Sequence, residues 1–442
     1  MTDGKRASWS GSLAFVLAAS ASAVGLGNLW RFPYLAAKYG GGVFIAVYLL
    51  LSLTLGFTLL VTEIALGRYS RQSQLTAFRQ LGHPRWNFLG VLSTIIPLFI
   101  LPYYNVIGGW VVKYFAAYVK LVSGGGGLEN PQAFFESFIA APWDPFVCMT
   151  IFTVVTCAVI IIGVKNGIEK ANLVMMPILF LMAIAICIYV VTMPGAADGL
   201  KYYLIPNMDC LTGADGKFSL ALLAKTLLGA TGQMFYSLSL AMGIMITYGS
   251  YLKKDRSLMG ESVNVICLDT FVALTAGLIV FPACSAFGVE AGQGPGLVFV
   301  TLPNIFNNMA GGRLWGSLFF VFMSFAALST VFAVFENIVA CLRDLLGWNR
   351  RKTCLITGLA LMVLSMPCVL GFTVLSHVTI LGLSIMDFED FLVSSILLPT
   401  GSLIFAIFCV CRYGWGWKNF VAEANEGKGF KVRSWMRLYM TY

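Results

Sequence analysis

The chain has 442 residues, of which 58% are hydrophobic and only 11% are charged, and its mean hydropathy is +0.83. A soluble domain carries about 25% charged residues, so this composition excludes a soluble protein and predicts an all-α polytopic membrane protein. The net charge is +9, but the basic residues are divided among separate loops, so we expect no nucleic-acid partner.

Ten apolar stretches are long enough to cross a bilayer. They cover residues 12–37, 41–69, 88–122, 145–163, 168–193, 221–251, 261–287, 314–342, 353–371 and 388–412. Lys and Arg are concentrated in one set of loops and Asp and Glu in the other, which predicts a cytoplasmic N-terminus. Because the first stretch is interrupted by glycines and Arg31, we do not expect it to be a cleaved signal peptide. We therefore expect a protein integral to the cell (inner or plasma) membrane.

The first stretch contains the segment "SASAVGLGNLWRFP", Ser20 to Pro33, in which Gly25, Gly27 and Asn28 interrupt an apolar helix. Unpaired backbone groups cost several kcal/mol in lipid, so a break persists only where a ligand or ion takes up the freed groups. Freed carbonyls suit a cation, and freed N–H groups suit an anion. The alternative is that these glycines are close contacts between helices.

A second interrupted stretch follows at residues 227–251, where small and polar residues again occur at mid-membrane. Interrupted spans at matching places in two halves are typical of transporters that bind their substrate near the bilayer midplane. Five spans per half make the second half inverted. We therefore predict one transporter domain over residues 1–442, with inverted repeats at about 10–195 and 218–413.

The sequence gives no indication of a metal site or of a catalytic site. The two histidines are far apart, and the 11 cysteines lie mostly within the apolar stretches without metal-ligand spacing. No Ser/His/Asp set or acid pair occurs at one membrane depth. We expect no organic cofactor, no enzyme activity and no disulfide in the outer loops.

The segment "AVGLGNLWRFPYLAAKYGGGVFI" resembles the first-span signature of the neurotransmitter:sodium symporter family, which shares the fold of the bacterial leucine transporter. The segments "TEIALGRYSR", "PYYNVIGGW", "SLSLAMGIMITYGSY", "GPGLVFVTLP" and "FAALST" agree in order along the chain. The resemblance implies the leucine-transporter fold, a five-plus-five inverted repeat with discontinuous spans 1 and 6. It is nearest to bacterial amino-acid members with eleven spans, so residues 414–442 are expected to be a cytoplasmic segment that leads to a truncated or missing eleventh span.

The resemblance implies two sodium sites. The first would use the Ala23 carbonyl, the Asn28 side chain, Ser237 and Asp269, together with the substrate carboxylate. The second would use the carbonyls of Ala21, Val24 and Ala326 and the hydroxyls of Ser329 and Thr330. All-oxygen ligation suits a hard cation. The alternative for the two hydroxyls is a hydrogen bond back to their own helix.

The resemblance also implies an amino-acid site. The substrate carboxylate would bind the N–H groups of Gly25, Leu26 and Gly27 and the Tyr104 hydroxyl, and the amine would bind carbonyls of Ala23, Tyr236 and Ser237 and the Ser239 hydroxyl. The side chain would contact Ile100, Tyr236, Met242, Thr330 and Val334. No charged side chain belongs to this set, which favours a neutral, hydrophobic amino acid, although aromatic and Met residues are also ordinary in helix packing.

Asp269 lies deep in the seventh span, where a buried acid is expensive and indicates function. The family usually has asparagine here, and chloride-dependent members add a serine one turn later, where this chain has Ala273. The resemblance therefore implies chloride independence and raises the possibility of proton antiport through Asp269. The alternative is a packed, permanently neutral acid.

The resemblance places gates at both mouths of the pocket. Arg31 would face Asp390 outside, with Asp387 and Glu389 as rivals. Arg6 would pair with Asp344 inside, with Trp9 as a plug and Tyr251 nearby, and Glu63 would bind N–H groups freed in the sixth span. Interfacial anchoring is the alternative for Trp9.

These features predict a sodium-coupled symporter for neutral amino acids that works by alternating access. Its partners would be a small amino-acid substrate and membrane lipid, and a monomer would suffice. The alternatives are an amino-acid-binding membrane sensor without net transport and an ion channel.

Overall fold

The computed structural model describes residues 7–122, 128, 130–213, 216–288, 296–434 and 436–437. Within these ranges the regular structure is helical, and β-pairing is limited to isolated bridges. Eight helices are long and apolar enough to cross a membrane, and a ninth span is a helix pair bent by 54° at residues 24–26. The predicted all-α polytopic architecture is confirmed.

The described residues of the first half of the chain form ten helices, some of which are joined by π-helical turns. They are α1 (Ser12–Ala23), α2 (Phe32–Lys38), α3 (Gly42–Leu51), α4 (Phe57–Ser70), α5 (Gln74–Gln80), α6 (Asn87–Val122), α7 (Pro131–Ala140), α8 (Asp144–Ile162), α9 (Lys170–Val191) and α10 (Ala196–Leu204). π-Helical turns precede α2 (Gly27–Arg31), join α3 to α4 (Ser52–Gly56) and lead into α9 (Val164–Glu169). Short 3₁₀ turns cover Pro84–Trp86 and Met208–Leu211.

The described part of the second half forms nine more helices. They are α11 (Leu220–Ser237), α12 (Ile244–Gly249), α13 (Leu258–Phe287), α14 (Leu302–Asn308), α15 (Gly312–Leu346), α16 (Arg350–Leu370), α17 (Ile385–Phe391), α18 (Leu398–Val410) and α19 (Trp417–Ala424). Two π-helical turns belong here, Leu297–Thr301 before α14 and Leu392–Leu397 between α17 and α18.

Polar side chains define where several of these helices begin. A side-chain oxygen just before the first turn accepts a hydrogen bond from a backbone N–H that has no partner within the helix. The caps of this kind are Asn130 for α7, Ser219 for α11, Ser257 for α13, Asn349 for α16 and Ser384 for α17.

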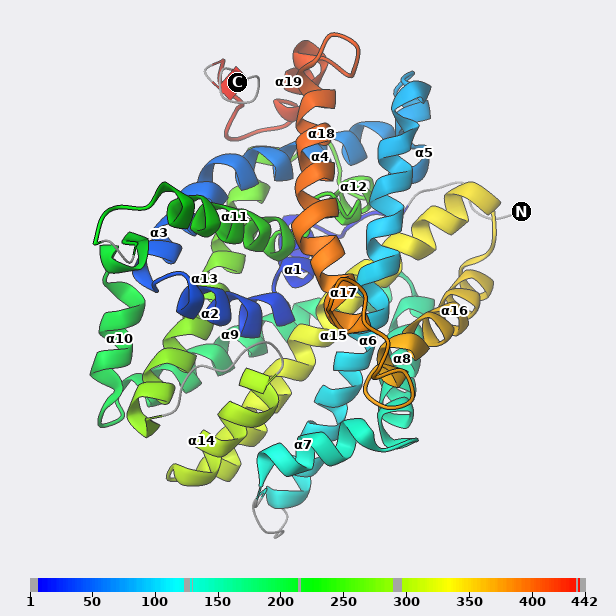
Figure 1. Ribbon diagram of the computed structural model, residues 1–442. Helices are drawn as coiled ribbons and strands as arrows, with labels where there is room; N and C mark the ends of the chain where they lie inside the picture. Colours follow the sequence, from blue (N-terminus) through cyan, green and yellow to red (C-terminus); the bar gives the residue numbers. More distant parts are fainter. Residues whose placement is uncertain are drawn as a thin grey trace.

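The helix α1 lies at the centre of the bundle, where it packs against α9, α12, α13 and α15 (Figure 1). Residues 14–23 of this helix are all buried. By contrast, α8, α9 and α16 present large exposed apolar side chains on their outer surfaces. In a membrane such side chains face the lipid, so the bundle has an apolar exterior around a central helix that meets only protein.

Both spans expected to be discontinuous are broken. The helix α1 ends at Ala23, and helical structure resumes at Gly27. In the sixth span, α11 ends at Ser237 and α12 begins at Ile244, so this predicted span is two short helices rather than one long one. The backbone between them is left-handed at Ser239, Ala241 and Gly243, with φ of 53°, 59° and 75°.

Candidate functional site

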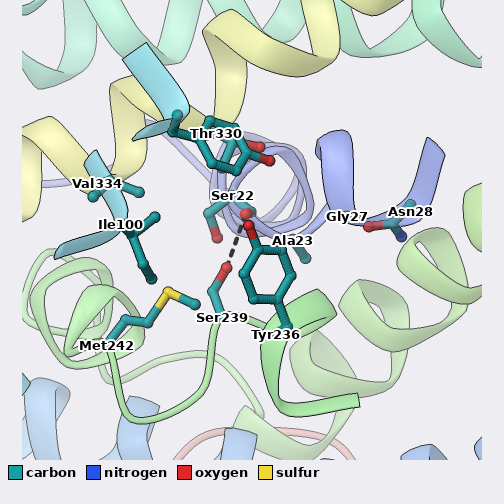
Figure 2. Close-up of a pocket in the computed structure, with 11 residues that line it drawn as sticks. Ser22, Ala23, Gly27, Asn28, Ile100, Tyr236, Ser239, Met242, Thr330 and Val334 are labelled. Atoms are coloured by element: carbon teal, nitrogen blue, oxygen red, sulfur yellow. Dashed lines mark hydrogen bonds between the residues drawn. The ribbon is translucent and has the colours of Figure 1, made fainter. Parts of the chain in front are cut away.

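A pocket lies between the two helix breaks at the centre of the bundle. Its lining consists of Ser22, Ala23, Gly27, Asn28, Ile100, Tyr104, Tyr236, Ser239, Met242, Thr330 and Val334. Figure 2 shows Ser22 and Ala23 at the end of α1, with Thr330 and Val334 on one side and Tyr236, Ser239 and Met242 on the other. The lining includes no charged side chain.

Nine of the twelve predicted substrate residues line this pocket, and the other three, Gly25, Leu26 and Ser237, do not. Leu26 is nevertheless tied to the pocket, because its backbone N–H donates to the Tyr104 hydroxyl at 2.8 Å. A Cβ atom on Gly25 would lie 2.5 Å from Thr330 Oγ1 and 2.6 Å from Tyr104 Oη. Only glycine therefore lets the broken backbone approach these two hydroxyls so closely.

The two breaks contact each other directly. The Ser239 hydroxyl donates to the Ser22 carbonyl at 2.9 Å across the pocket (Figure 2). The Tyr236 ring lies against Gly27, where a Cβ atom would be 2.6 Å from Cε1 of the ring. Sequence reasoning missed Ser22, although its position next to Ala23 at the end of a helix predicts a carbonyl without an intrahelical partner.

Asn28, Ser237 and Asp269 form a buried oxygen-rich cluster beside the pocket. Asp269 accepts hydrogen bonds from Asn28 Nδ2 at 2.7 Å and from Ser237 Oγ at 2.8 Å. Tyr48, which sequence reasoning missed, brings its hydroxyl to 3.2 Å from the second carboxylate oxygen. All four side chains are fully or almost fully buried, so the carboxylate charge is balanced here only by neutral donors.

A second group of oxygens lies between α1 and α15. The Thr330 hydroxyl contacts the carbonyl of Ala21 in the last turn of α1 at 3.4 Å and that of Val24, the residue after α1, at 3.3 Å. The Ser329 hydroxyl instead donates to the Ala326 carbonyl of its own helix at 3.1 Å. The alternative of a bond back to the same helix therefore applies to Ser329, whereas Thr330 reaches across to α1.

At the mouth expected to face outward, Arg31 faces Asp390 with 3.9 Å between Nε and Oδ2. The rival acids are engaged elsewhere, since Asp387 contacts the cap residue Ser384 and Glu389 accepts from the Cys368 thiol. The Arg31 guanidinium also lies 5.1 Å from the centre of the Tyr236 ring.

Two neutral residues beside Arg31 and Asp390 were missed by sequence reasoning. Gln233 accepts from Arg31 Nη1 and donates to the Gly27 carbonyl, each at 3.1 Å. Tyr103 contacts both Tyr236 and Asp390 through its hydroxyl. The sequence does not indicate that this glutamine and this tyrosine contact the charged pair, because that depends on which side of its helix each residue faces.

At the mouth expected to face the cytoplasm, Trp9 is buried and donates from its indole N–H to the Tyr248 carbonyl at 3.1 Å. Its ring packs edge-on against the rings of Tyr248 and Tyr251. Asp344 accepts from the Ser73 backbone N–H at 2.8 Å. The expected pairing of Asp344 with Arg6 lies outside the described residues.

Two buried acids accept hydrogen bonds from the sixth span and from the segment that follows it. Glu63 on α4 accepts a hydrogen bond from Ala241 N at 2.6 Å, which is the contact predicted with the broken sixth span. Glu336 on α15, which sequence reasoning missed, accepts from the Tyr251 hydroxyl at 3.1 Å and pairs with Arg350 at 2.5 Å.

The segment after α18 is fastened to α4 through the helix α19. Arg68 and Glu423 form an almost completely buried ion pair at 2.6 Å. Lys254 bridges Glu423 and Glu426 at 3.3 and 2.9 Å. The hydrogen bond between Lys254 and Glu426 raises the pKa of the lysine and lowers the pKa of the Glu426 carboxyl.

A helical membrane bundle with a neutral pocket between two broken spans is the architecture of a transporter that binds its solute near mid-membrane. The described residues contain no group of three or more His, Cys, Asp or Glu side chains suited to hold a metal ion. Backbone carbonyls, hydroxyls and one carboxylate at the pocket are hard oxygen donors, which suit an alkali cation.

The sequence model of the sodium:neurotransmitter symporter family matches residues 6–122 and 136–442, and the chain belongs to this family. An uncharacterized sodium-dependent transporter of Bacillus subtilis (strain 168), YhdH, is 36% identical over 97% of this chain and 94% of its own length. The human sodium- and chloride-dependent GABA transporter 2 is 26% identical over 97% of this chain and 76% of its own length.

The chain also resembles a solved structure, that of MhsT in complex with L-phenylalanine. The TM-score is 0.88 and the identity 37%, with 99% of this chain and 96% of MhsT covered. The predicted leucine-transporter fold is confirmed. The protein is a sodium-dependent membrane transporter of small molecules and not an enzyme.

Proposed function

We propose that the chain is a sodium-coupled symporter of neutral, hydrophobic amino acids that works by alternating access. The observation that carries the proposal is the contact of Ser239 with Ser22, which brings the two helix breaks together around a pocket without charged side chains. Such a pocket offers freed backbone groups to the two charged ends of a zwitterion and apolar walls to its side chain.

The substrate carboxylate would bind at the α1 break, where Leu26 N and the Tyr104 hydroxyl meet. The amine would bind among the carbonyls and the Ser239 hydroxyl on the other side of the pocket. Ile100, Met242 and Val334 line the pocket with apolar atoms, which suits an aliphatic or aromatic side chain. The complex of the similar transporter MhsT with L-phenylalanine supports this choice of substrate class.

Two sodium ions would accompany the substrate. Asn28, Ser237 and Asp269 already converge on one another and, with the Ala23 carbonyl, would make the first site. The second site would lie where Thr330 meets the carbonyls of Ala21 and Val24, completed by the Ala326 carbonyl and the Ser329 hydroxyl. Both donor sets consist of oxygen atoms, as a hard cation requires.

Asp269 would make transport independent of chloride. Its carboxylate is buried among neutral donors beside the first cation cluster, so it supplies a negative charge that would otherwise have to come from an anion. Ala273, one turn further along α13, has no hydroxyl to bind one. Without sodium the same buried charge is poorly compensated, so protonation of Asp269 on the return step would give proton antiport.

The gates would be Arg31 with Asp390 on the outer side and Trp9, Tyr251 and the Arg6–Asp344 pair on the inner side. Exposed ion pairs are worth only about 0–1 kcal/mol, which suits contacts that must open in every cycle. The N-terminus would be cytoplasmic in a bacterial cell membrane, and a single copy of the 442-residue domain would suffice.

Sealed liposomes containing the purified full chain test the proposal. We expect an inward sodium gradient to drive accumulation of radiolabelled L-phenylalanine, without change when chloride is replaced by gluconate. A competition screen with all common amino acids would then rank the substrates. Sodium-dependent binding without accumulation would indicate a sensor, and rapid sodium flux that needs no amino acid would indicate a channel.

A further inference from the structure

Tyr103 lies just outside the pocket and is not among its lining residues. It is 2% exposed, and its hydroxyl lies 2.9 Å from the Tyr236 hydroxyl and 3.2 Å from Asp390 Oδ1. A buried tyrosine hydroxyl usually finds a hydrogen-bond partner, but this one has two, and they belong to different parts of the transporter. Tyr236 is a wall of the pocket, whereas Asp390 faces Arg31 at the outer mouth.

The proton positions in this chain of three groups follow from their chemistry. A carboxylate can only accept a hydrogen bond, and a tyrosine hydroxyl has one proton to donate. Since Tyr103 donates to Asp390, the contact between the two hydroxyls requires Tyr236 to donate to Tyr103. The bonds therefore run in one direction, from Tyr236 through Tyr103 to Asp390, and each strengthens the other.

Asp390 divides its two oxygens between different partners. Oδ1 accepts from Tyr103 at 3.2 Å, whereas Oδ2 lies 3.9 Å from Arg31 Nε, near the limit for an ion pair. The Asp390 side chain is 37% exposed, so its ion pair with Arg31 is screened by solvent. The partly buried bond to Tyr103 is the shorter of these two contacts, and it joins Asp390 to the tyrosine that bonds the pocket wall.

We propose that Tyr103 is a positioning residue that ties the Tyr236 ring to the outer gate, so that Asp390 and the wall above the substrate move together. The inference rests on the proposed function, because it assumes that Tyr236 covers a bound amino acid. Removing the tether should let the wall open while the substrate is bound. The substrate would then leave faster, but the cation clusters, which Tyr103 does not touch, would keep their affinity.

The test measures how fast bound, radiolabelled L-phenylalanine dissociates from the purified full chain in saturating sodium. Tyr103→Phe and Tyr236→Phe keep both rings and remove only hydroxyls. A net hydrogen bond is worth about 0.5–1.5 kcal/mol, so each variant should release the probe about 2- to 10-fold faster. Tyr189→Phe is the matched control, because it removes a hydroxyl that bonds the Ala310 carbonyl at 2.9 Å away from the pocket.

The double variant distinguishes a tether from two independent contributions. Once Tyr103 lacks its hydroxyl, that of Tyr236 has nothing to bind, so the double variant should be no faster than Tyr103→Phe alone. The sodium concentration for half-maximal binding should stay within about twofold in all variants, which a general structural defect would not preserve.

Two results would overturn the inference. One is a Tyr103→Phe rate equal to that of Tyr189→Phe, and the other is a double variant whose rate is the product of the single effects. Sodium-dependent binding by the unaltered chain tests the proposed function, whereas the ratios between variants test the tether, so the two failures are distinguishable.

Discussion

Replacing Asp269 by asparagine removes one negative charge from the cluster with Asn28 and Ser237 and changes little else. The amide oxygen can take the place of Oδ1, where Asn28 Nδ2 donates at 2.7 Å. The amide NH₂ would then face the hydroxyls of Ser237 and Tyr48, which lie 2.9 and 3.2 Å from Oδ2. Hydroxyls can accept as well as donate, so the fold should survive.

The loss in sodium affinity follows from the missing charge. Two unit charges about 4 Å apart attract by about 4 kcal/mol at an effective dielectric constant of 20. Part of this is offset, because the variant no longer buries a carboxylate. A net loss of about 1–3 kcal/mol corresponds to about 5- to 150-fold weaker sodium binding.

Sodium titration of L-phenylalanine binding to the purified chain measures this loss. Glu389→Gln is the control, since Glu389 is an acid that contacts Cys368 and not the cluster, and it should shift the sodium midpoint less than twofold. An unchanged midpoint in Asp269→Asn, or an equal shift in both variants, would refute the assignment of Asp269 to a sodium site.

The same substitution tests proton antiport. If Asp269 carries a proton outward on the return step, sodium-driven uptake should make the lumen of liposomes alkaline, and Asp269→Asn should abolish this change. A pH-sensitive dye in the lumen reports it. Alkalinisation that persists in the variant would show that another group carries the proton.

Three further substitutions test other parts of the structure. Gly25→Ala should abolish L-phenylalanine binding, because its Cβ would lie 2.5 Å from Thr330 Oγ1, whereas Gly11→Ala meets no atom within 4 Å and should bind normally. Thr330→Val removes the hydroxyl that contacts two α1 carbonyls and should raise the sodium midpoint about 2- to 10-fold in the same titration. Arg68→Ala removes the buried partner of Glu423 and leaves the half-exposed Lys254 as the cation beside its carboxylate, so it should lower stability by about 1–3 kcal/mol, measured by thermal unfolding in detergent. Lys254→Ala removes only the half-exposed partner and should cost about 0–1 kcal/mol.

The part of the site that depends on backbone breaks could be predicted from the sequence. Gly25 and Gly27 in an apolar stretch indicated the first break, and the helix does stop at Ala23 and resume at Gly27. The second break was signalled only by small and polar residues at mid-membrane. Its left-handed positions include Ser239 and Ala241, two residue types that give no hint of positive φ.

Contacts between side chains on different helices were harder to predict. Tyr48 and Tyr103 are two of 17 tyrosines in the chain. From sequence alone, a tyrosine on an apolar helix is interpreted as a residue of the hydrophobic core. Which hydroxyl turns toward Asp269 or Tyr236 depends on the rotation of each helix about its axis, which is set by the packed bundle as a whole.

One ambiguity could have been resolved from local rules alone. In "SIMDFED", Ser384 is followed three residues later by Asp387, which is the spacing of a reciprocal helix cap. The structure has half of this motif, because Asp387 N donates to Ser384 Oγ at 3.2 Å, and the Asp387 carboxylate is held at 2.7 Å by the Ser384 hydroxyl rather than by its backbone N–H. Applied to the sequence, the rule removes Asp387 from the acids that compete for Arg31.

The two breaks differ in how they are maintained, and this difference bears on transport. The first uses glycines, whose lack of a side chain lets Thr330 and Tyr236 approach the backbone closely. The second holds Ser239 and Ala241 in a left-handed conformation that costs about 1–2 kcal/mol per residue. Two hydrogen bonds offset that cost, from Ser239 to the Ser22 carbonyl and from Ala241 N to Glu63. Because one partner belongs to α1 and the other to α4, the shape of the second break depends on where those helices stand, so a movement of either helix would change the pocket directly.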